Sequence, residues 1–172
     1  MNLSVYEQSI PQFMNELNAL KGILAKTKAW SEAKKMDVNV FWGMRLAPDM
    51  FPLGKQIQIV CDGAKAFAGR LTSKPAPVFE DKEQTYEEFI ARINNTMSYL
   101  ETIKPEDFAG YENKNIEFPW YPGMYLMGKD YVIQHAIPNF YFHLTTTYAI
   151  LRSNGVDLGK MDFLGQQNWK KK

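Results

Sequence analysis

The residues that could do chemistry gather in one segment, between positions 131 and 151, which holds both histidines of the chain. Asn139 and His143 are four residues apart, so a helix would place them on one side, one turn apart. His135 lies four residues before Asn139, and Thr146 follows on the same side. Two ligands at this spacing on a helix can chelate one divalent ion, as helix-borne zinc sites do.

A hydrogen-bonded core histidine fits the same spacing. Pro138 lies between His135 and Asn139, where it removes a backbone hydrogen bond and can kink the helix. The pattern therefore leaves two interpretations open, a ligand-binding groove and a polar spot in the core.

Other catalytic patterns are absent from the sequence. It contains neither a glycine-rich phosphate loop nor a nucleophile elbow. The single cysteine, Cys61, lies in an apolar helical pattern without a visible activating partner, which is typical of a buried, inert thiol.

The composition is that of an ordinary globular protein. The chain has 172 residues, of which 45% are hydrophobic and 23% charged, and its formal net charge is +1. We expect a single domain over residues 1–172. The even charge balance gives no clustered basic face, so we expect no nucleic-acid partner.

Two features of the sequence bear on where in the cell the protein is found. One cysteine allows no intrachain disulfide, and no basic stretch followed by an apolar run opens the sequence, so we expect a cytoplasmic protein. Residues 131–151 carry no Asp, Glu, Lys or Arg and are long enough to span a bilayer. Their many polar side chains would be costly in lipid, which favours a helix buried in a protein core and no membrane partner.

Four segments repeat apolar residues at spacings of three and four, which places those residues on one side of a helix. Four helices with such stripes bury their apolar sides against one another most simply in an all-α four-helix bundle. The stripes are Ile10, Phe13, Leu17, Leu20 and Leu24; Leu53, Ile57, Val60, Ala64, Phe67 and Leu71; Tyr86, Ile90, Ile93, Met97 and Leu100; and Ile133, Ile137, Phe140, Leu144, Tyr148 and Leu151.

Local signals mark the ends of these helices. Thr85 and Glu88 form a capping box that predicts the start of the third helix, and Pro105 predicts its end. Gly155 predicts the end of the fourth. Between the third and fourth helices, alternating residues on both sides of a Pro-Gly pair predict a small hairpin over residues 115–126.

Three phrases of the sequence resemble the signature of an uncharacterised bacterial family, one of the numbered domains of unknown function. They are residues 45–53 (RLAPDMFPL), 138–143 (PNFYFH) and 159–165 (GKMDFLG). That family is grouped with the DinB/YfiT-like superfamily of proposed metalloenzymes. The resemblance implies a four-helix bundle with a long crossover, a homodimer, and a site for a divalent metal such as zinc or nickel.

The superfamily binds its metal through three histidines, one on the second helix and two spaced four apart on the fourth. Matching the phrases around Phe51, Asp62 and residues 150–155 places these ligands at Ile59, Asn139 and His143. The resemblance thus implies a degenerate metal site in which His143 is the remaining histidine. Isoleucine cannot bind a metal, and asparagine is a weak ligand for zinc or nickel.

Two classes of function remain open. The first is a small-molecule enzyme or binding protein that uses a pocket around His143, Asn139, His135 and Thr146, with or without a metal. Relatives suggest thiol transfer or hydrolysis as metal-dependent reactions. The second is a non-catalytic, dimeric helical scaffold. In either case we expect His143 to be buried, neutral, and at the bottom of any pocket, because burial disfavours the charged imidazole.

Overall fold

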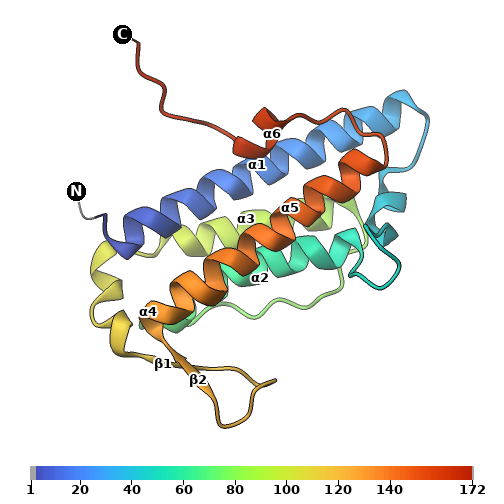
Figure 1. Ribbon diagram of the computed structural model, residues 1–172. Helices are drawn as coiled ribbons and strands as arrows, with labels where there is room; N and C mark the ends of the chain where they lie inside the picture. Colours follow the sequence, from blue (N-terminus) through green and yellow to red (C-terminus); the bar gives the residue numbers. More distant parts are fainter. Residues whose placement is uncertain (1–2, 172) are drawn as a thin grey trace.

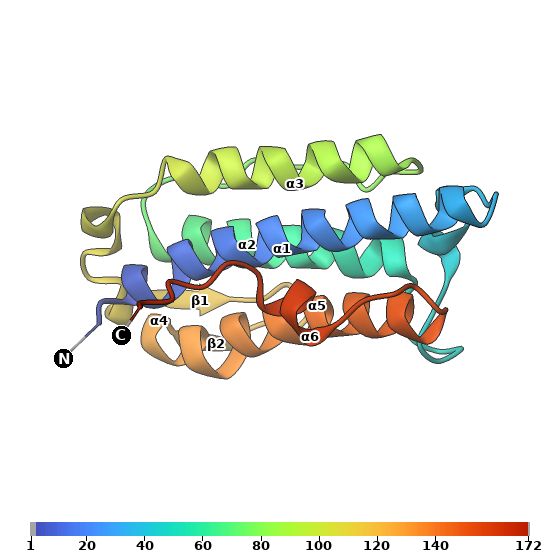
Figure 2. The same cartoon turned by 90° about the horizontal axis from the view of Figure 1, so that it is seen from above.

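Four long helices form the body of the computed structural model, which describes residues 3–171. They are α1 (Val5–Ala33), α2 (Leu53–Leu71), α3 (Tyr86–Glu101) and α5 (Ile137–Ser153). Figure 2 shows α3 along one side and α5 along the other, with α1 and α2 between them. The predicted four-helix bundle is confirmed, and the capping box of Thr85 and Glu88 begins α3 as expected.

Short elements connect the long helices. The one between α1 and α2 is the 3-10 helix η1, and a strand pair with two further 3-10 turns separates α3 from α5. These connections are η1 (Val38–Gly43), η2 (Pro105–Phe108), η3 (Tyr111–Asn113), β1 (Asn115–Glu117), β2 (Tyr125–Met127), α4 (Gly128–Asp130) and η4 (Tyr131–Ala136), and α6 (Lys160–Leu164) follows α5. No helix within residues 3–171 is long and apolar enough to cross a membrane.

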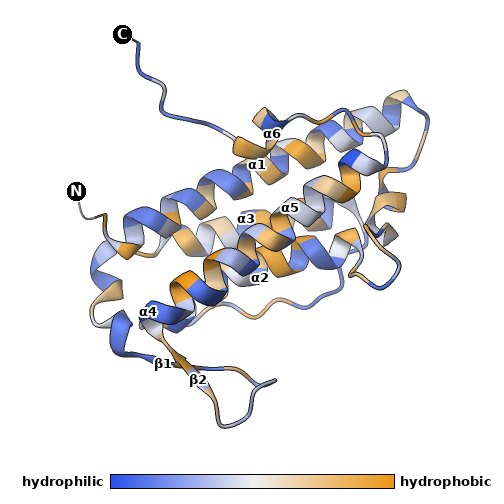
Figure 3. Ribbon diagram, in the orientation of Figure 1, coloured by the Kyte–Doolittle hydropathy of each residue, from blue (hydrophilic) through white to orange (hydrophobic). Residues whose placement is uncertain are grey.

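The predicted apolar stripes meet in the core, except that Ile133, the first residue of the fourth stripe, is 66% exposed. Figure 3 shows hydrophobic and hydrophilic stretches alternating along each long helix. At the centre, the Phe13 ring of α1 lies 5.2 Å from that of Phe67 on α2 and 4.5 Å from that of Phe140 on α5. All three side chains are buried, so aromatic packing joins these three helices at one point.

The predicted hairpin is present and projects from the end of the bundle near α4 (Figure 1). Its strands are antiparallel, with Ile116 opposite Leu126. Gly128 links β2 to α4 at a close approach, because a Cβ there would lie 1.8 Å from the carbonyl oxygen of Tyr111. This contact sets the path of the chain into the fourth long helix.

The fourth helix does not begin as a regular α-helix. Residues Tyr131–Ala136 of η4 form a π-helix, in which the N–H of Ile137 donates to the carbonyl of Val132 five residues earlier. Pro138 has no N–H to donate in the next turn, so the regular pattern is already broken there. The proline anticipated from the sequence as a kink therefore coincides with a widened turn.

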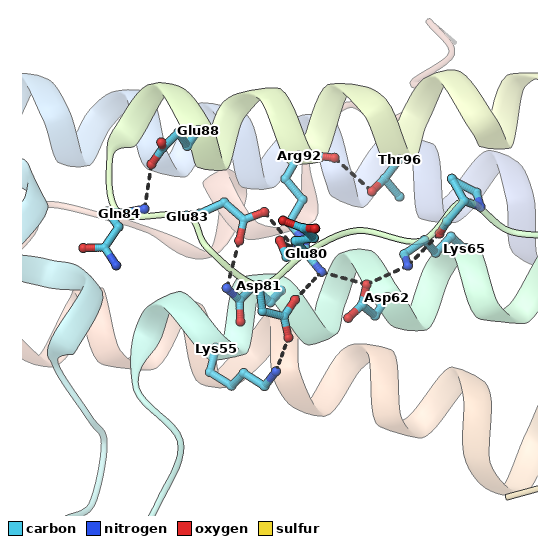
Figure 4. Close-up of polar contacts among 12 residues, drawn as sticks. Lys55, Asp62, Lys65, Glu80, Asp81, Glu83, Gln84, Glu88, Arg92 and Thr96 are labelled. Carbon is cyan, nitrogen blue, oxygen red and sulfur yellow. Dashed lines mark hydrogen bonds and ion pairs between the residues drawn. The ribbon is translucent and has the colours of Figure 1, made fainter. Parts of the chain in front are cut away.

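A long crossover connects α2 to α3. Residues 72–85 run back along the bundle, so that α2 and α3 lie parallel (Figures 1 and 2). One guanidinium fastens this crossover. The Arg92 side chain of α3 is 1% exposed and its nitrogens lie 2.8 Å from Glu83, 2.8 Å from Asp62 and 3.0 Å from Asp81 (Figure 4).

Two lysines complete this group of charges, here called the Arg92 cluster. Lys65 lies 3.0 Å from Asp62, and Lys55 pairs with Asp81. Burial alone would raise the pKa of Asp81, but the hydrogen bond and charge of Lys55, with the charge of Arg92, outweigh it and lower the pKa. The cluster ties α2, α3 and the crossover together.

We expect Arg92→Met to destabilise the protein by about 2–3 kcal/mol, because it removes the cation shared by three carboxylates and leaves the largely buried Glu83 carboxylate without its ion pair, while Lys55 and Lys65 still pair with Asp81 and Asp62. Lys82→Met is the matched control, since Lys82 pairs with Glu80 on the surface and such pairs contribute about 0–1 kcal/mol. Urea unfolding of both variants measures the difference. Equal losses in the two variants would contradict the role given to Arg92.

Candidate functional site

A cavity of about 170 Å³ lies where α2 faces η4 and the start of α5. Four polar side chains, those of Asp62, Arg70, His135 and Asn139, line it, and the rest of its wall is apolar or aromatic. The lining residues are Ile59, Asp62, Gly63, Ala66, Arg70, Trp120, Tyr131, His135, Ala136 and Asn139.

The α2 wall owes its shape to small residues. Ile59, Gly63, Ala66 and Arg70 follow one another at spacings of four and three, so they share one side of the helix. A Cβ added at Gly63 would meet nothing closer than the Asn139 Nδ2 atom, at 3.9 Å. The missing side chain at Gly63 thus leaves open the space that the cavity occupies.

The opposite wall carries two of the residues singled out in the sequence. His135 and Asn139 both line the cavity, on either side of Pro138. Burial, and next the positive charge of Arg70, lower the pKa of His135, so its imidazole is neutral at pH 7. A neutral imidazole offers one hydrogen-bond donor and one acceptor, and the Asn139 amide offers both as well.

Arg70 brings a positive charge to the same cavity. Its guanidinium carbon lies 5.0 Å from the centre of the Phe118 ring and 5.6 Å from that of Tyr131. Cation–π contacts of this kind hold the side chain against the aromatic wall. Burial raises the pKa of the Tyr131 hydroxyl, although the nearby Arg70 charge partly offsets that effect.

Asp62 lies between the cavity and the Arg92 cluster. Its side chain is partly exposed, and its Oδ1 atom contacts both Arg92 and Lys65. This position arises because the crossover brings α3 against this side of α2. One carboxylate therefore connects the cavity wall to the buried Arg92.

A second cavity, of about 230 Å³, adjoins the first and shares Trp120 and His135 with it. The hairpin supplies nearly all of its lining, which is strongly aromatic. Besides the shared pair, the lining residues are Phe118, Tyr121, Met124, Tyr125 and Leu126. Several of these side chains are more than half exposed, among them Tyr121 at 59% and Met124 at 66%.

His143 lies deeper than His135 and Asn139, and is not among the residues that line either cavity. It is buried, and its Nδ1 atom is 2.6 Å from the Oε1 atom of Gln56. The Gln56 amide nitrogen donates to the carbonyl of Phe51, so Oε1 is the acceptor and His143 Nδ1 carries the proton. Burial lowers the pKa of His143, as the sequence predicted.

Thr146 faces elsewhere again. Its hydroxyl donates to the carbonyl of Phe142, and the residue lines an open groove beside Leu46 on the outer side of α5. The four candidate residues of the sequence thus separate into a cavity pair, His135 and Asn139, a core histidine, His143, and a buried threonine, Thr146, at the floor of a different groove.

The positions that match the superfamily's metal ligands do not form a three-histidine centre. Ile59 and Asn139 line the cavity, while His143 bonds to Gln56 outside it. Nowhere between residues 3 and 171 do three or more His, Cys, Asp or Glu side chains group as a metal ion would require. The donor set present at this place does not fit the metal that the resemblance implied.

Sequence reasoning missed Arg70 and Tyr131 as parts of the site. Arg70 carried a usable signal, because it extends the stripe of Ile59, Gly63 and Ala66 by one turn. Trp120 belongs to the aromatic cluster of residues 118–125, which the sequence left open between covering the end of the bundle and lining a pocket, and it lines both cavities.

We expect His143→Ala to destabilise the protein by about 1–3 kcal/mol, because the Gln56 oxygen is left unpaired. In the native protein the lowered pKa means that the unfolded chain binds the proton more tightly. The contribution of neutral His143 to the free energy of unfolding is therefore complete above about pH 6.5, the ordinary histidine pKa, and is lost as the pH falls from there through the lowered pKa of the folded protein.

Urea unfolding at pH 7.5 and 5.5 checks this effect, with His143→Gln as the variant that still reaches Gln56 but cannot titrate. We expect a smaller difference between the two pH values in that variant than in the native protein. An NMR titration in which His143 shows an unshifted or raised pKa would contradict the explanation.

Comparison with known proteins places this geometry in a family. A crystal structure of a DinB family member protein from Shewanella denitrificans is 43% identical in sequence, with 98% of this chain and 96% of that chain covered and a TM-score of 0.93. No curated protein matches the chain. The profile of the domain of unknown function DUF1993 matches residues 5–164. The chain therefore belongs to the DUF1993 family, and its fold is DinB-like.

Proposed function

We propose that the protein binds a small organic molecule in the cavity between α2 and η4, without a three-histidine metal centre. The observation that carries the proposal is the convergence of Arg70, His135 and Asn139 on a space left open by Gly63. Concave sites with a few convergent polar groups and apolar walls are typical of ligand binding.

The size of the site limits the ligand. The two adjoining cavities, of about 170 and 230 Å³, are each smaller than the roughly 300–1,000 Å³ of drug-sized pockets. We therefore expect a compact molecule with a polar end near His135 and an apolar part against the hairpin. If the protein is also an enzyme, neutral His135 is the side chain suited to accept a proton there.

We expect Gly63→Leu to abolish binding, because the new side chain occupies the cavity while leucine is a good helix former. Gly22→Leu is the matched control, since Gly22 lies on the exposed side of α1 with nothing within 4 Å of a Cβ. Ligand-observed NMR with a library of small aryl and alkyl compounds measures binding to protein purified without an affinity tag and treated with EDTA.

Compounds that bind the native protein and the control equally, but not Gly63→Leu, support the proposal. The absence of any bound compound, or binding that survives in Gly63→Leu, would overturn it. Binding that requires added zinc or nickel would overturn the metal-free part of the proposal.

A second proposal concerns assembly. We infer that the protein is a homodimer that pairs through the outer side of α5. Support comes from Phe142 and Leu46, which are 56% and 45% exposed and border one groove with Tyr141, Thr145 and Ala149. Residues 131–151 contain no charged side chain, and a neutral apolar face can meet its own copy across a two-fold axis without charge repulsion.

We expect Phe142→Asp to convert the dimer to a monomer, because it places a charge in the centre of this face. Val78→Asp is the control, since Val78 is 93% exposed in the crossover and does not border the groove. Light scattering across micromolar concentrations gives the mass in each case. A monomeric native protein would rule out the homodimer.

We also infer a cytoplasmic location. The inference is supported by the single cysteine, Cys61, because one cysteine allows no intrachain disulfide. Cys61 is also buried, and burial raises the pKa of its thiol to about 12, so the thiol is unreactive.

A further inference from the structure

Arg70 is a cavity-lining cation without a carboxylate partner. Among residues 3–171 it forms no salt bridge, and its guanidinium rests against the Phe118 and Tyr131 rings. The aromatic contacts fix its place but do not neutralise its charge. The charge therefore remains available to a molecule in the cavity.

The other charges near the cavity cancel. Asp62 is the acidic residue in the lining, and it belongs to the Arg92 cluster. That cluster contains three basic residues, Lys55, Lys65 and Arg92, and three acidic residues, Asp62, Asp81 and Glu83. Since His135 is neutral at pH 7 and Asp62 is ion-paired, Arg70 is the charged residue of the lining whose charge no described ion pair offsets.

The space beside Arg70 is aromatic. Its guanidinium lies against Phe118, which also lines the second cavity, and Trp120 and His135 form the wall shared by the two. A ligand with a charged end at Arg70 can thus extend an apolar part toward Met124 and Tyr125 without meeting another charged residue in either lining except Asp62.

Resting on the function proposed above, we infer that the ligand is a small organic monocarboxylate with an aromatic or branched apolar tail. A guanidinium presents two parallel N–H groups whose spacing matches the two oxygens of one carboxylate. His135 and Asn139 lie on the same cavity and can hydrogen-bond polar groups next to the carboxylate. The tail packs among the hairpin aromatics.

The test compares 3-phenylpropanoate with its neutral isostere 3-phenylpropanamide by calorimetry at pH 7.5 and constant ionic strength. We expect the native protein to bind the carboxylate at least tenfold more tightly. Arg70→Gln should remove that preference, whereas the control Arg152→Gln, on an exposed residue at the end of α5, should keep it.

A second readout follows His135 by NMR titration. The Arg70 charge contributes to lowering the pKa of His135, and Asp62 and Tyr131 are the other titratable groups of the lining. A bound carboxylate offsets that charge, so the pKa of His135 should rise with 3-phenylpropanoate and stay unchanged with 3-phenylpropanamide. Arg70→Gln should raise this pKa before any ligand is added.

Equal affinities for the two compounds, or a preference that survives in Arg70→Gln, would overturn the carboxylate inference. If 3-phenylpropanamide still binds the native protein and not Gly63→Leu, the proposed small-molecule site stands by itself. If neither compound binds while other library compounds do, the inference fails and the site remains. If no compound of any kind binds, both fail.

Discussion

The buried guanidinium of Arg92 is the constraint on which the arrangement of α2 and α3 depends, because a buried cation is costly unless it is paired with opposite charge. Two of its partners, Asp81 and Glu83, lie in the crossover, and the third, Asp62, lies on α2. The extended crossover has no regular structure of its own between residues 74 and 84. Its path is set by the need to bring these carboxylates to Arg92.

The same constraint reaches the candidate site through α2. Asp62 faces Arg92, and its neighbour Gly63 faces Asn139. The orientation of α2 about its own axis that pairs Asp62 with Arg92 therefore also turns Gly63, which has no side chain, toward the cavity. Two turns before Gly63, on the same side of α2, Gln56 fixes His143 in the core. One helix thus holds the charged cluster, the cavity and the core histidine in a fixed relation. Loss of the cluster would disturb all three.

The long helices were predictable because burial of an apolar stripe determines them, and Phe13, Phe67 and Phe140 lie where their stripes place them. Helical spacing grouped Asn139 with His143, but Asn139 lines the cavity with His135, whereas His143 bonds to Gln56 in the core. The partner of His143 was not predictable, since Gln56 is distant in sequence and only packing brings α2 and α5 together. The role of Arg92 was not predictable either, because two of its partners come from a crossover whose course no local pattern specifies.

The π-helical turn of η4 has a consequence for how this family can diversify. A π-turn amounts to one extra residue inside an α-helix. Deleting Ala136, which lies between His135 and α5, would remove the extra residue and move His135 by one position, about 100° around the helix axis. The bundle packing, carried by Phe140 and Leu144, would remain as it is. A single insertion or deletion in evolution can therefore change which side chains face the cavity without rebuilding the scaffold.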